Sequence, residues 1–385
     1  MGVKVYVIPL SQQSFAGDMV HGTVDLQVEA AHYEGSLADK LTLRLVGKAS
    51  TLVCRKANIQ QIIREEQEII SYEVQLTSFD GKATRGRHSY PFSLALPPGL
   101  PPTMKETDLG GGRCEIKYTL EARLHRPGCL NFDAKGKTEL VVFPMPNKTP
   151  PTPVAMGPDT RRVKKCWCFP GGSISLGFEA DRSIVGRNEV MSVVVVACNN
   201  SSSNVNDLEI EIKQETRWYA RSHGDLRKRT IASVKIPGSQ LGELQRAPEK
   251  GHERGRSQAA IEDAAQRDLQ DMLKAGAGTK YELVVPSNCH TSTQTSLIVV
   301  RHALVVELKT PSCITSPEVW MPLRVQQNVS QDVTEGPTPY GAAFEGGAIG
   351  DSTSLSMHYS STTTGCTRSM SDPVSPETKL SSPFS

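Results

Sequence analysis

The stretch that most constrains the fold spans residues 164–219, where three consecutive runs of hydrophobic residues have the periodicity of β-strands. In the first and third runs apolar residues recur at every second position, which would place them on one face of a sheet. The middle run, 191–198, is continuously apolar and β-branched, which is typical of a strand covered on both sides. Residues 181–189 and 199–207 are rich in Gly, Asn, Ser and Asp, which favour turns. The stretch therefore predicts the opening of an antiparallel all-β domain.

Shorter alternations predict a second all-β domain in residues 1–143. Strand-like runs lie near residues 3–7, 20–28, 41–45, 69–76, 90–96, 114–124 and 140–143. Short strands with turn signals between them and no long helix indicate an antiparallel, immunoglobulin-like β-sandwich. Residues 59–68 have a composition that also suits a short helix, but we expect extended structure or an exposed hairpin tip there.

Four segments follow from these patterns. The N-terminal sandwich takes residues 1–143, and the proline-rich residues 144–163 predict a semi-rigid linker. The second sandwich takes residues 164–326, with an insertion at about 243–276 where apolar residues have helical spacing. That insertion is either a loop helix packed on the sandwich or an exposed docking helix for a partner. Residues 327–385 are dominated by Gly, Ser and Thr and are predicted to be disordered.

Particular motifs carry a resemblance to a known family. In the second sandwich they are Cys166-Trp167-Cys168, the segment GSISL at 172–176, and the segments 186–189, 199–201 and 214–219. In the first sandwich they are segments 17–28, 41–47, 90–102 and 118–127. Together they resemble the arrestin-domain-containing proteins, the α-arrestins, over about residues 1–326. His302 departs from the pattern, because the family usually has an aromatic residue there. The resemblance implies two arrestin-like β-sandwiches.

Composition limits the class of protein. The net charge is +2, which argues against a chain-wide nucleic-acid binder. The nine cysteines are scattered and odd in number, which indicates reduced thiols in the cytosol rather than a disulfide framework. No apolar run approaches the length of a membrane helix, and the first ten residues are too short and strand-like for a signal peptide. We therefore expect a cytoplasmic protein.

The sequence has no recognisable catalytic constellation. A Gly-x-Ser-x-Gly elbow, a His-Glu-x-x-His pair and a Walker loop are all missing from it. Cys166 and Cys168 suggest a metal site, but zinc usually needs a second pair of ligands, and none follows with suitable spacing. Packing at a strand entry is the preferred role of this Cys-Trp-Cys motif. We expect a protein that is not an enzyme and that binds no cofactor and no metal.

Two basic clusters are the candidate contact sites, either for anionic lipid headgroups or for phosphorylated receptor tails. The alternative is an ordinary solvated surface, which charge runs usually form. The first cluster is at the end of the predicted linker and the second is near a predicted strand turn: Arg161, Arg162, Lys164 and Lys165, and Arg217, Arg221, Arg227, Lys228 and Arg229.

The tail holds two further candidate sites. Ser375 and Ser382 each precede a proline, as proline-directed kinases require, and phosphates there would add charge that can pair with the basic clusters. Pro337, Pro339 and Tyr340 form a degenerate version of the Pro-Pro-x-Tyr motif that docks in WW domains. The second proline is displaced by one residue, so we expect weak WW binding or none.

The resemblance also implies a function. By analogy with α-arrestins, the chain would be an adaptor that binds tails of membrane-protein cargo and links them, by an indirect route, to a ubiquitin ligase or sorting machinery. It would act in the cytoplasm, with recruitment to the plasma membrane or endosomes and a possible contact with an anionic membrane surface. The alternative is an arrestin-fold coat or scaffold subunit in endosomal transport, like that of retromer.

Overall fold

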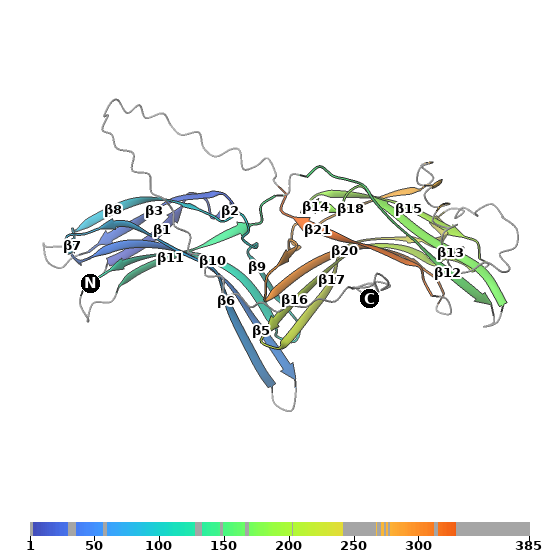
Figure 1. Cartoon of the computed structure of the whole chain (residues 1–385), viewed down its shortest axis with the longest axis horizontal. Coiled ribbons are helices and arrows are strands. Elements are labelled where there is room, and N and C mark those ends of the chain that lie inside the picture. The colour runs from blue at the N-terminus through green and yellow to red at the C-terminus, as the bar shows by residue number, and fades with distance from the viewer. Residues whose placement is uncertain are drawn as a thin grey trace, which may run out of the picture. The chain divides into compact units, whose positions relative to one another are not determined.

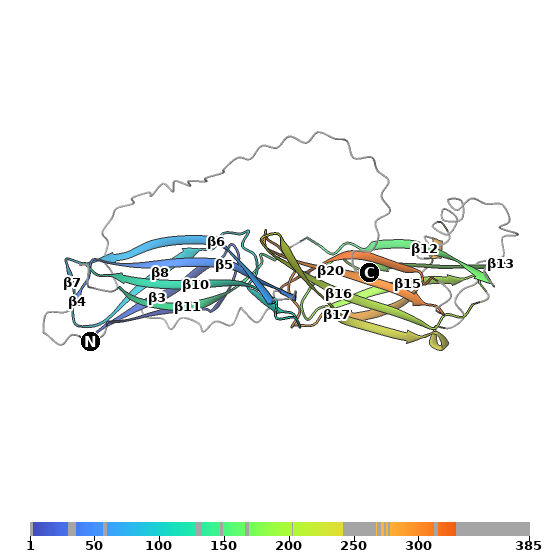
Figure 2. The ribbon, with the colours of Figure 1, turned by 90° about the horizontal axis from the view of Figure 1, so that it is seen from below.

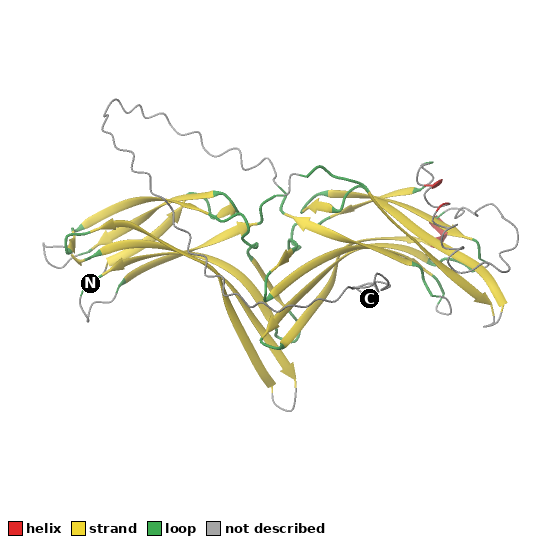
Figure 3. Ribbon diagram, viewed as in Figure 1, coloured by secondary structure: helices red, strands yellow, loops and turns green. Residues whose placement is uncertain are grey.

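The computed structural model describes residues 3–29, 36–56, 60–127, 133–146, 149–165, 169–201, 203–241, 267, 271–272, 275, 278–311 and 315–328. Regular structure in these residues is almost entirely β-strand (Figure 3). This confirms the predicted all-β class. Both sandwiches belong to one compact unit, Met1–Asn328.

The N-terminal sandwich consists of a three-stranded sheet packed on a six-stranded sheet (Figure 1). The three-stranded sheet has the order β1-β3-β8: β1 (Val3–Pro9), β3 (Met19–Val28) and β8 (Gly86–Ala95). The six-stranded sheet has the order β2-β11-β10-β5-β6, and β9 pairs with β10: β2 (Gln13–Phe15), β11 (Ala134–Phe143), β10 (Arg113–His125), β5 (Lys40–Lys56), β6 (Gln60–Ser78) and β9 (Met104–Thr107). The short strands β4 (Ser36–Leu37) and β7 (Lys82–Ala83) pair with each other.

Strand β10 shows why this sequence folds as it does. Every second residue of β10, from Cys114 to Leu124, is fully buried, and burying a side chain such as Leu contributes roughly 1.5–3 kcal/mol. Gly47 on β5 lies against the ring of Tyr118, and any side chain at this glycine would overlap that ring. The Tyr118 hydroxyl donates a hydrogen bond to the carbonyl oxygen of Pro101 at 2.7 Å. The core strand therefore also fixes the proline-rich loop that follows β8.

Strands β5 and β6 form a hairpin that continues past the ends of the neighbouring strands (Figures 1 and 2). Pairing is continuous from Lys40–Ser78 to Lys56–Gln60, apart from two register shifts. The ambiguous residues 59–68 are therefore extended from Gln60 onward, as predicted, and both strands continue beyond the sequence patterns at 41–45 and 69–76. The outer part of the hairpin still contributes Ala49, Val53 and Ile63 to the core.

The C-terminal sandwich repeats the arrangement with a four-stranded and a six-stranded sheet. The first has the order β12-β13-β15-β18: β12 (Val154–Lys165), β13 (Phe169–Ala180), β15 (Val190–Asn199) and β18 (Thr279–Val284). The second has the order β14-β21-β20-β16-β17, and β19 pairs with β20: β14 (Ile184–Gly186), β21 (Glu318–Gln326), β20 (Ile298–Lys309), β16 (Asp207–Ala220), β17 (His223–Pro237) and β19 (Thr293–Gln294). A single 3₁₀ turn, η1 (Gly238–Gln240), follows β17.

The structure differs from the sequence prediction in two places. Residues 154–163 of the predicted linker belong to β12, which pairs with β13 through Val154–Ala180 and Arg161–Ile174. The prolines at 150, 151 and 153 conceal the strand, because its first residue follows them directly. The turns also contain two short strands that pair in parallel with a late strand of the same sandwich, β2 with β11 and β14 with β21.

The predicted insertion and tail lie mostly outside the described residues. Residues 267, 271 and 272 are helical, and the Ala275 amide donates a hydrogen bond to the Asp271 carbonyl oxygen at 2.9 Å, as in a helical turn. In the described part of the chain, no helix is long and apolar enough to span a membrane.

The boundary between the two hydrophobic cores does not coincide with the linker, because one core contains residues of both sandwiches. The core of the N-terminal sandwich also contains Trp218 and Ala220 from β16 and three residues around the start of β20, namely Leu297, Ile298 and Val300. A second cluster, which includes Phe178, Ile210 and Met321, fills the C-terminal sandwich. The two sandwiches therefore share one apolar interface.

Candidate functional site

The first predicted basic cluster lies on β12. The Arg161 guanidinium pairs with Asp159 at 2.9 Å, and Arg162 is exposed. The side chains of Lys164 and Lys165 lie outside the described residues. An exposed ion pair such as that of Arg161 is worth little, about 0–1 kcal/mol, so a competing anion would displace it at low cost.

The second predicted cluster does not form one free surface. Arg217 pairs with Glu215 at 2.5 Å, Arg227 pairs with Glu106, and the Arg229 guanidinium donates to the side-chain oxygen of Gln214 at 3.1 Å. Arg227 and Arg229 are both partly buried, at alternate positions of β17, whereas Arg221 and Lys228 are exposed. The structure thus assigns three of these arginines to contacts within the fold, and anion binding by the cluster stays a prediction.

The candidate tail residues Ser375, Ser382, Pro337, Pro339 and Tyr340 lie outside the described residues. So do Cys166, Trp167 and Cys168.

The interface between the sandwiches is centred on Trp218. Its side chain is fully buried, and its indole N–H donates to the carbonyl oxygen of Leu52 on β5 at 3.1 Å. These two residues are 166 positions apart in the sequence. A buried indole usually has such a partner, so Trp218 supplies both apolar contact and a directed hydrogen bond across the interface.

Polar contacts extend this interface along one row of the N-terminal sheet. Glu65, Thr51, Cys114 and Glu106 are cross-strand neighbours on β6, β5, β10 and β9. The Thr51 hydroxyl donates to the Tyr219 carbonyl oxygen at 2.6 Å, and the Glu65 carboxylate accepts the Arg221 backbone N–H. The end of the β16–β17 hairpin is therefore held against this row.

Glu106 is the buried charge of the interface. Its carboxylate is 6% exposed and is bound on one oxygen by the Arg227 guanidinium and on the other by His290 Nε2 at 3.1 Å. The His290 backbone N–H donates to the side-chain oxygen of Gln214, also at 3.1 Å. Because a buried charge is costly unless it is paired, Arg227 and His290 offset the cost of burying Glu106.

His302 continues the network into the C-terminal sandwich. It is 2% exposed, with Nδ1 2.9 Å from the Ser292 hydroxyl and Nε2 3.4 Å from the Gln214 side-chain oxygen. An amide oxygen can only accept, so Nε2 carries the proton. Nδ1 then accepts from Ser292, whose oxygen in turn accepts the Val325 backbone N–H at 2.9 Å. The hydrogen bonds therefore hold His302 as a neutral imidazole.

Burial and nearby cations lower the pKa of both His290 and His302. Burial, with smaller contributions from His290 and Arg229, lowers the pKa of His302 to about 3. Burial also lowers the pKa of His290, and Arg229 and Arg187 reinforce that effect, whereas Glu106 opposes it. A group whose pKa is lowered on folding in this way takes up protons less readily in the folded chain, so acid destabilises the fold that buries it.

The carboxyl groups of Asp108 and Asp225 form a pair whose protonation at low pH favours the fold. Burial and the neighbouring carboxylate of Asp108 raise the pKa of Asp225. Asp108 precedes β10 in the N-terminal sandwich, whereas Asp225 is on β17. Protonation of this pair at low pH relieves like-charge repulsion.

The buried thiols of Cys114 and Cys289 are not activated nucleophiles. Burial raises the pKa of Cys114 to about 12 and also raises that of Cys289. A thiol in that range is protonated at neutral pH, and the thiolate is the reactive form. Among the residues the structure describes, no group of three or more His, Cys, Asp or Glu side chains is placed to hold a metal ion.

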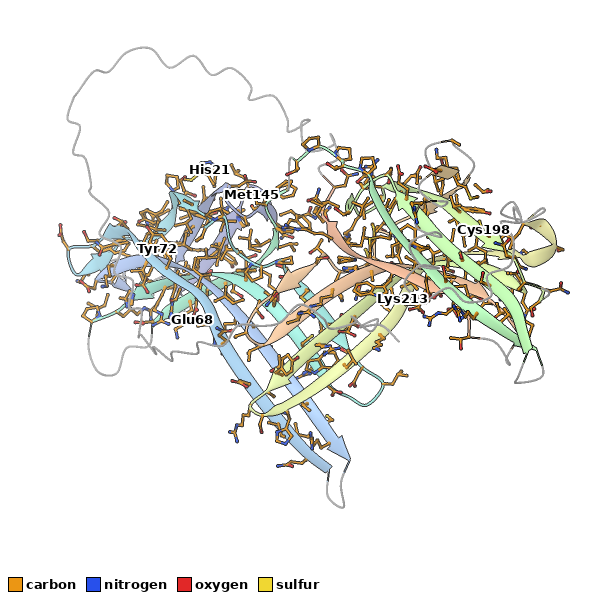
Figure 4. All side chains as sticks on the ribbon, turned by 45° about the vertical axis from the view of Figure 1, so that its right-hand side comes forward. His21, Glu68, Tyr72, Met145, Cys198 and Lys213 are labelled. Carbon is orange, nitrogen blue, oxygen red and sulfur yellow. The ribbon has the colours of Figure 1, made fainter. Side chains whose placement is uncertain are left out.

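Open grooves lie on the surface of the described chain. One of about 460 Å³ lies on the β5–β6 hairpin beside Arg64 and Arg113, and one of about 440 Å³ lies along β1 beside Tyr6 and Lys137. The third, of about 480 Å³, lies between the proline-rich loop after β8 and the β19–β21 region. It includes Met145, which is labelled in Figure 4.

These features define a protein of two antiparallel sandwiches with a shared interface and open surface grooves. The family model described as arrestin (or S-antigen), N-terminal domain, matches residues 11–147, which run from just before β2 to just after β11. The chain therefore contains an arrestin N-terminal domain. Proteins of the arrestin family are generally non-catalytic scaffolds, and the match indicates an adaptor role of that general kind.

Sequence reasoning missed two sets of residues. The Glu106–His290 pair joins positions 184 apart, and no local pattern marks either residue. Arg301 and Arg324 were missed because each stands alone in an apolar strand pattern, and only the pairing of β20 with β21 brings them together.

Proposed function

We propose that the protein is a non-catalytic adaptor that binds membrane-protein cargo and links it to endocytic, ubiquitination or sorting machinery. It would work in the cytoplasm and be recruited to the plasma membrane or endosomes. The observation that carries this proposal is the arrestin N-terminal domain match at 11–147. The fold supports it, since two sandwiches offer strand edges, grooves and loops that suit extended peptides.

The interface supports the same role. Trp218 and the Glu106 network hold the grooves on both sandwiches in a fixed relation, and preorganised surfaces lose less entropy on binding. The raised pKa values of Cys114 and Cys289 are consistent with a protein that does no thiol chemistry.

Proximity labelling in cells tests this proposal. The full chain fused to a labelling enzyme should enrich membrane proteins with cytoplasmic tails, together with ligase or sorting components, over the labelling enzyme alone. Absence of membrane proteins from the enriched set would contradict the adaptor role. A constant, stoichiometric complex with fixed subunits on gel filtration of native lysate would instead favour the coat-subunit alternative.

A further inference from the structure

The 480 Å³ groove has two walls of different chemistry. One wall is apolar and comes from Pro98, Leu100, Pro101 and Pro102 of the loop after β8, with Pro144 and the exposed Met145. The other wall comes from β19, β20 and β21. It carries the polar side chains Thr293, Gln294, Arg301 and Arg324 beside Val299 and Val300. The volume falls in the range of roughly 300–1,000 Å³ that is typical of ligand sites.

The two arginines are neighbours of like charge. His302 and Leu323 are cross-strand partners on β20 and β21, and Arg301 and Arg324 occupy the next position of the same register. Both side chains are exposed and line the groove. Like charges at opposed positions of a sheet repel each other, so the pair raises the energy of the empty groove.

No carboxylate among the described residues offsets this repulsion by an ion pair with either arginine. Glu215 on β16 is the other cross-strand neighbour of Arg301. One of its carboxylate oxygens binds Arg217 at 2.5 Å, and the other is buried without a hydrogen-bond partner. Arg324 is fixed through its backbone, which pairs with Ile184 on β14 and donates to the Ser183 carbonyl oxygen at 2.9 Å. The groove thus presents two guanidinium groups from a rigid backbone.

The apolar wall is fixed as well. Tyr118 binds the Pro101 carbonyl oxygen, and Thr103 exchanges hydrogen bonds with Val142 at 2.8 and 2.9 Å. Its prolines have no backbone N–H to donate, so this wall offers contact area rather than hydrogen bonds. An occupant would need anionic groups on one side and apolar groups on the other.

We propose that this groove binds an extended, acidic segment of a partner protein, with two carboxylates toward Arg301 and Arg324 and alternate apolar side chains toward the proline wall. Side chains two apart in an extended peptide point the same way, about 6–7 Å apart, which is within reach of two long arginine side chains on neighbouring strands. A recessed groove with an apolar wall fits a peptide better than a flat lipid surface. The inference names a partner class for the adaptor role and rests on that proposed function.

The test measures binding of the full-length chain to a fluorescein-labelled peptide, Val-Asp-Val-Glu-Val, by fluorescence anisotropy. The double variant Arg301→Gln/Arg324→Gln should bind about tenfold more weakly, since each exposed charge pair contributes up to about 1 kcal/mol. Affinity for the wild-type chain should also fall with salt. The matched control is Arg55→Gln/Arg85→Gln, which removes two other exposed arginines and should leave affinity unchanged.

Several results would overturn the proposal. The first is equal peptide affinity of the wild-type chain and the Arg301/Arg324 variant. The second is equal affinity of the wild-type chain for the acidic peptide and for Val-Asn-Val-Gln-Val. The third is that the arginine pair binds phosphopeptides or phosphatidylserine vesicles but not the acidic peptide. An unchanged melting temperature of the Arg301/Arg324 variant would show that its loss of peptide affinity is not due to unfolding. If the peptide results hold but cells show no labelled membrane proteins, the adaptor proposal fails alone. If membrane proteins are labelled but the variant still binds peptide, this inference fails alone.

Discussion

Acid should destabilise this protein through His302. The imidazole has an ordinary pKa of 6.5 and a folded pKa of about 3, so between these values the unfolded chain binds a proton that the folded chain does not. Stability is therefore fully present above pH 6.5 and is lost as the pH falls toward 3. At pH 5, about 1.5 pH units below the unfolded pKa, the loss from this one group is about 2 kcal/mol.

Urea unfolding followed by tryptophan fluorescence at several pH values between 8 and 5 measures this loss. The variant His302→Gln keeps a side chain that can donate to Gln214 and accept from Ser292, but it does not titrate. Its stability should start lower than that of the wild-type chain at pH 8, and the gap between the two should narrow by about 2 kcal/mol at pH 5. Comparing the two chains cancels the contributions of groups such as Asp225.

The matched control is His21→Gln, at an exposed histidine of the N-terminal sandwich (Figure 4), which should leave the pH dependence unchanged. The reasoning is refuted if the wild-type chain and His302→Gln lose stability in parallel between pH 8 and 5. That result would mean that His302 becomes protonated inside the fold at ordinary cost.

Three further predictions concern the interface and the tail. In urea unfolding, Trp218→Ala should destabilise the fold by about 3–5 kcal/mol. The control Trp320→Ala, at a partly buried site, should cost much less. Equal effects of the two substitutions would count against a central role for Trp218. Phosphomimetic glutamates at Ser375 and Ser382 should raise protection of the tail from proteases compared with alanines at both positions, through pairing with basic side chains; equal protection would refute this regulation. Isolated WW domains should capture the chain weakly or not at all, and robust capture that is lost in Tyr340→Ala would show that the displaced proline is tolerated.

Most strands were predictable because one face of each is buried. Alternation along residues 208–218 and 114–124 follows directly from the two-residue period of a strand that covers a core. The outer half of the β5–β6 hairpin was harder to predict, because Arg64, Glu65 and Glu66 interrupt the apolar pattern around the buried Val53 and Ile63. Strand β12 was hidden behind prolines, and β2 and β14 have only three residues each.

The functional surface was less predictable than the fold. The basic residues of 217–229 were found by their density in the sequence, yet Arg217, Arg227 and Arg229 all have partners within the fold. Arg301 and Arg324 carry no local signal, and their significance comes from strand register and from the absence of a paired carboxylate in the described region. Local charge density predicts where cations occur, but it does not predict which cations remain available to a partner.

The central claim is that the two sandwiches form one unit through a shared apolar interface. The most direct test places a protease site at residues 147–152, between β11 and β12, and cuts it in the purified chain. We predict that the two pieces elute together on gel filtration, because Trp218, Ile298 and Val300 are buried in the core of the other sandwich, and that Trp218→Ala weakens their association. Separation of the cut wild-type chain into two independent pieces would contradict the claim.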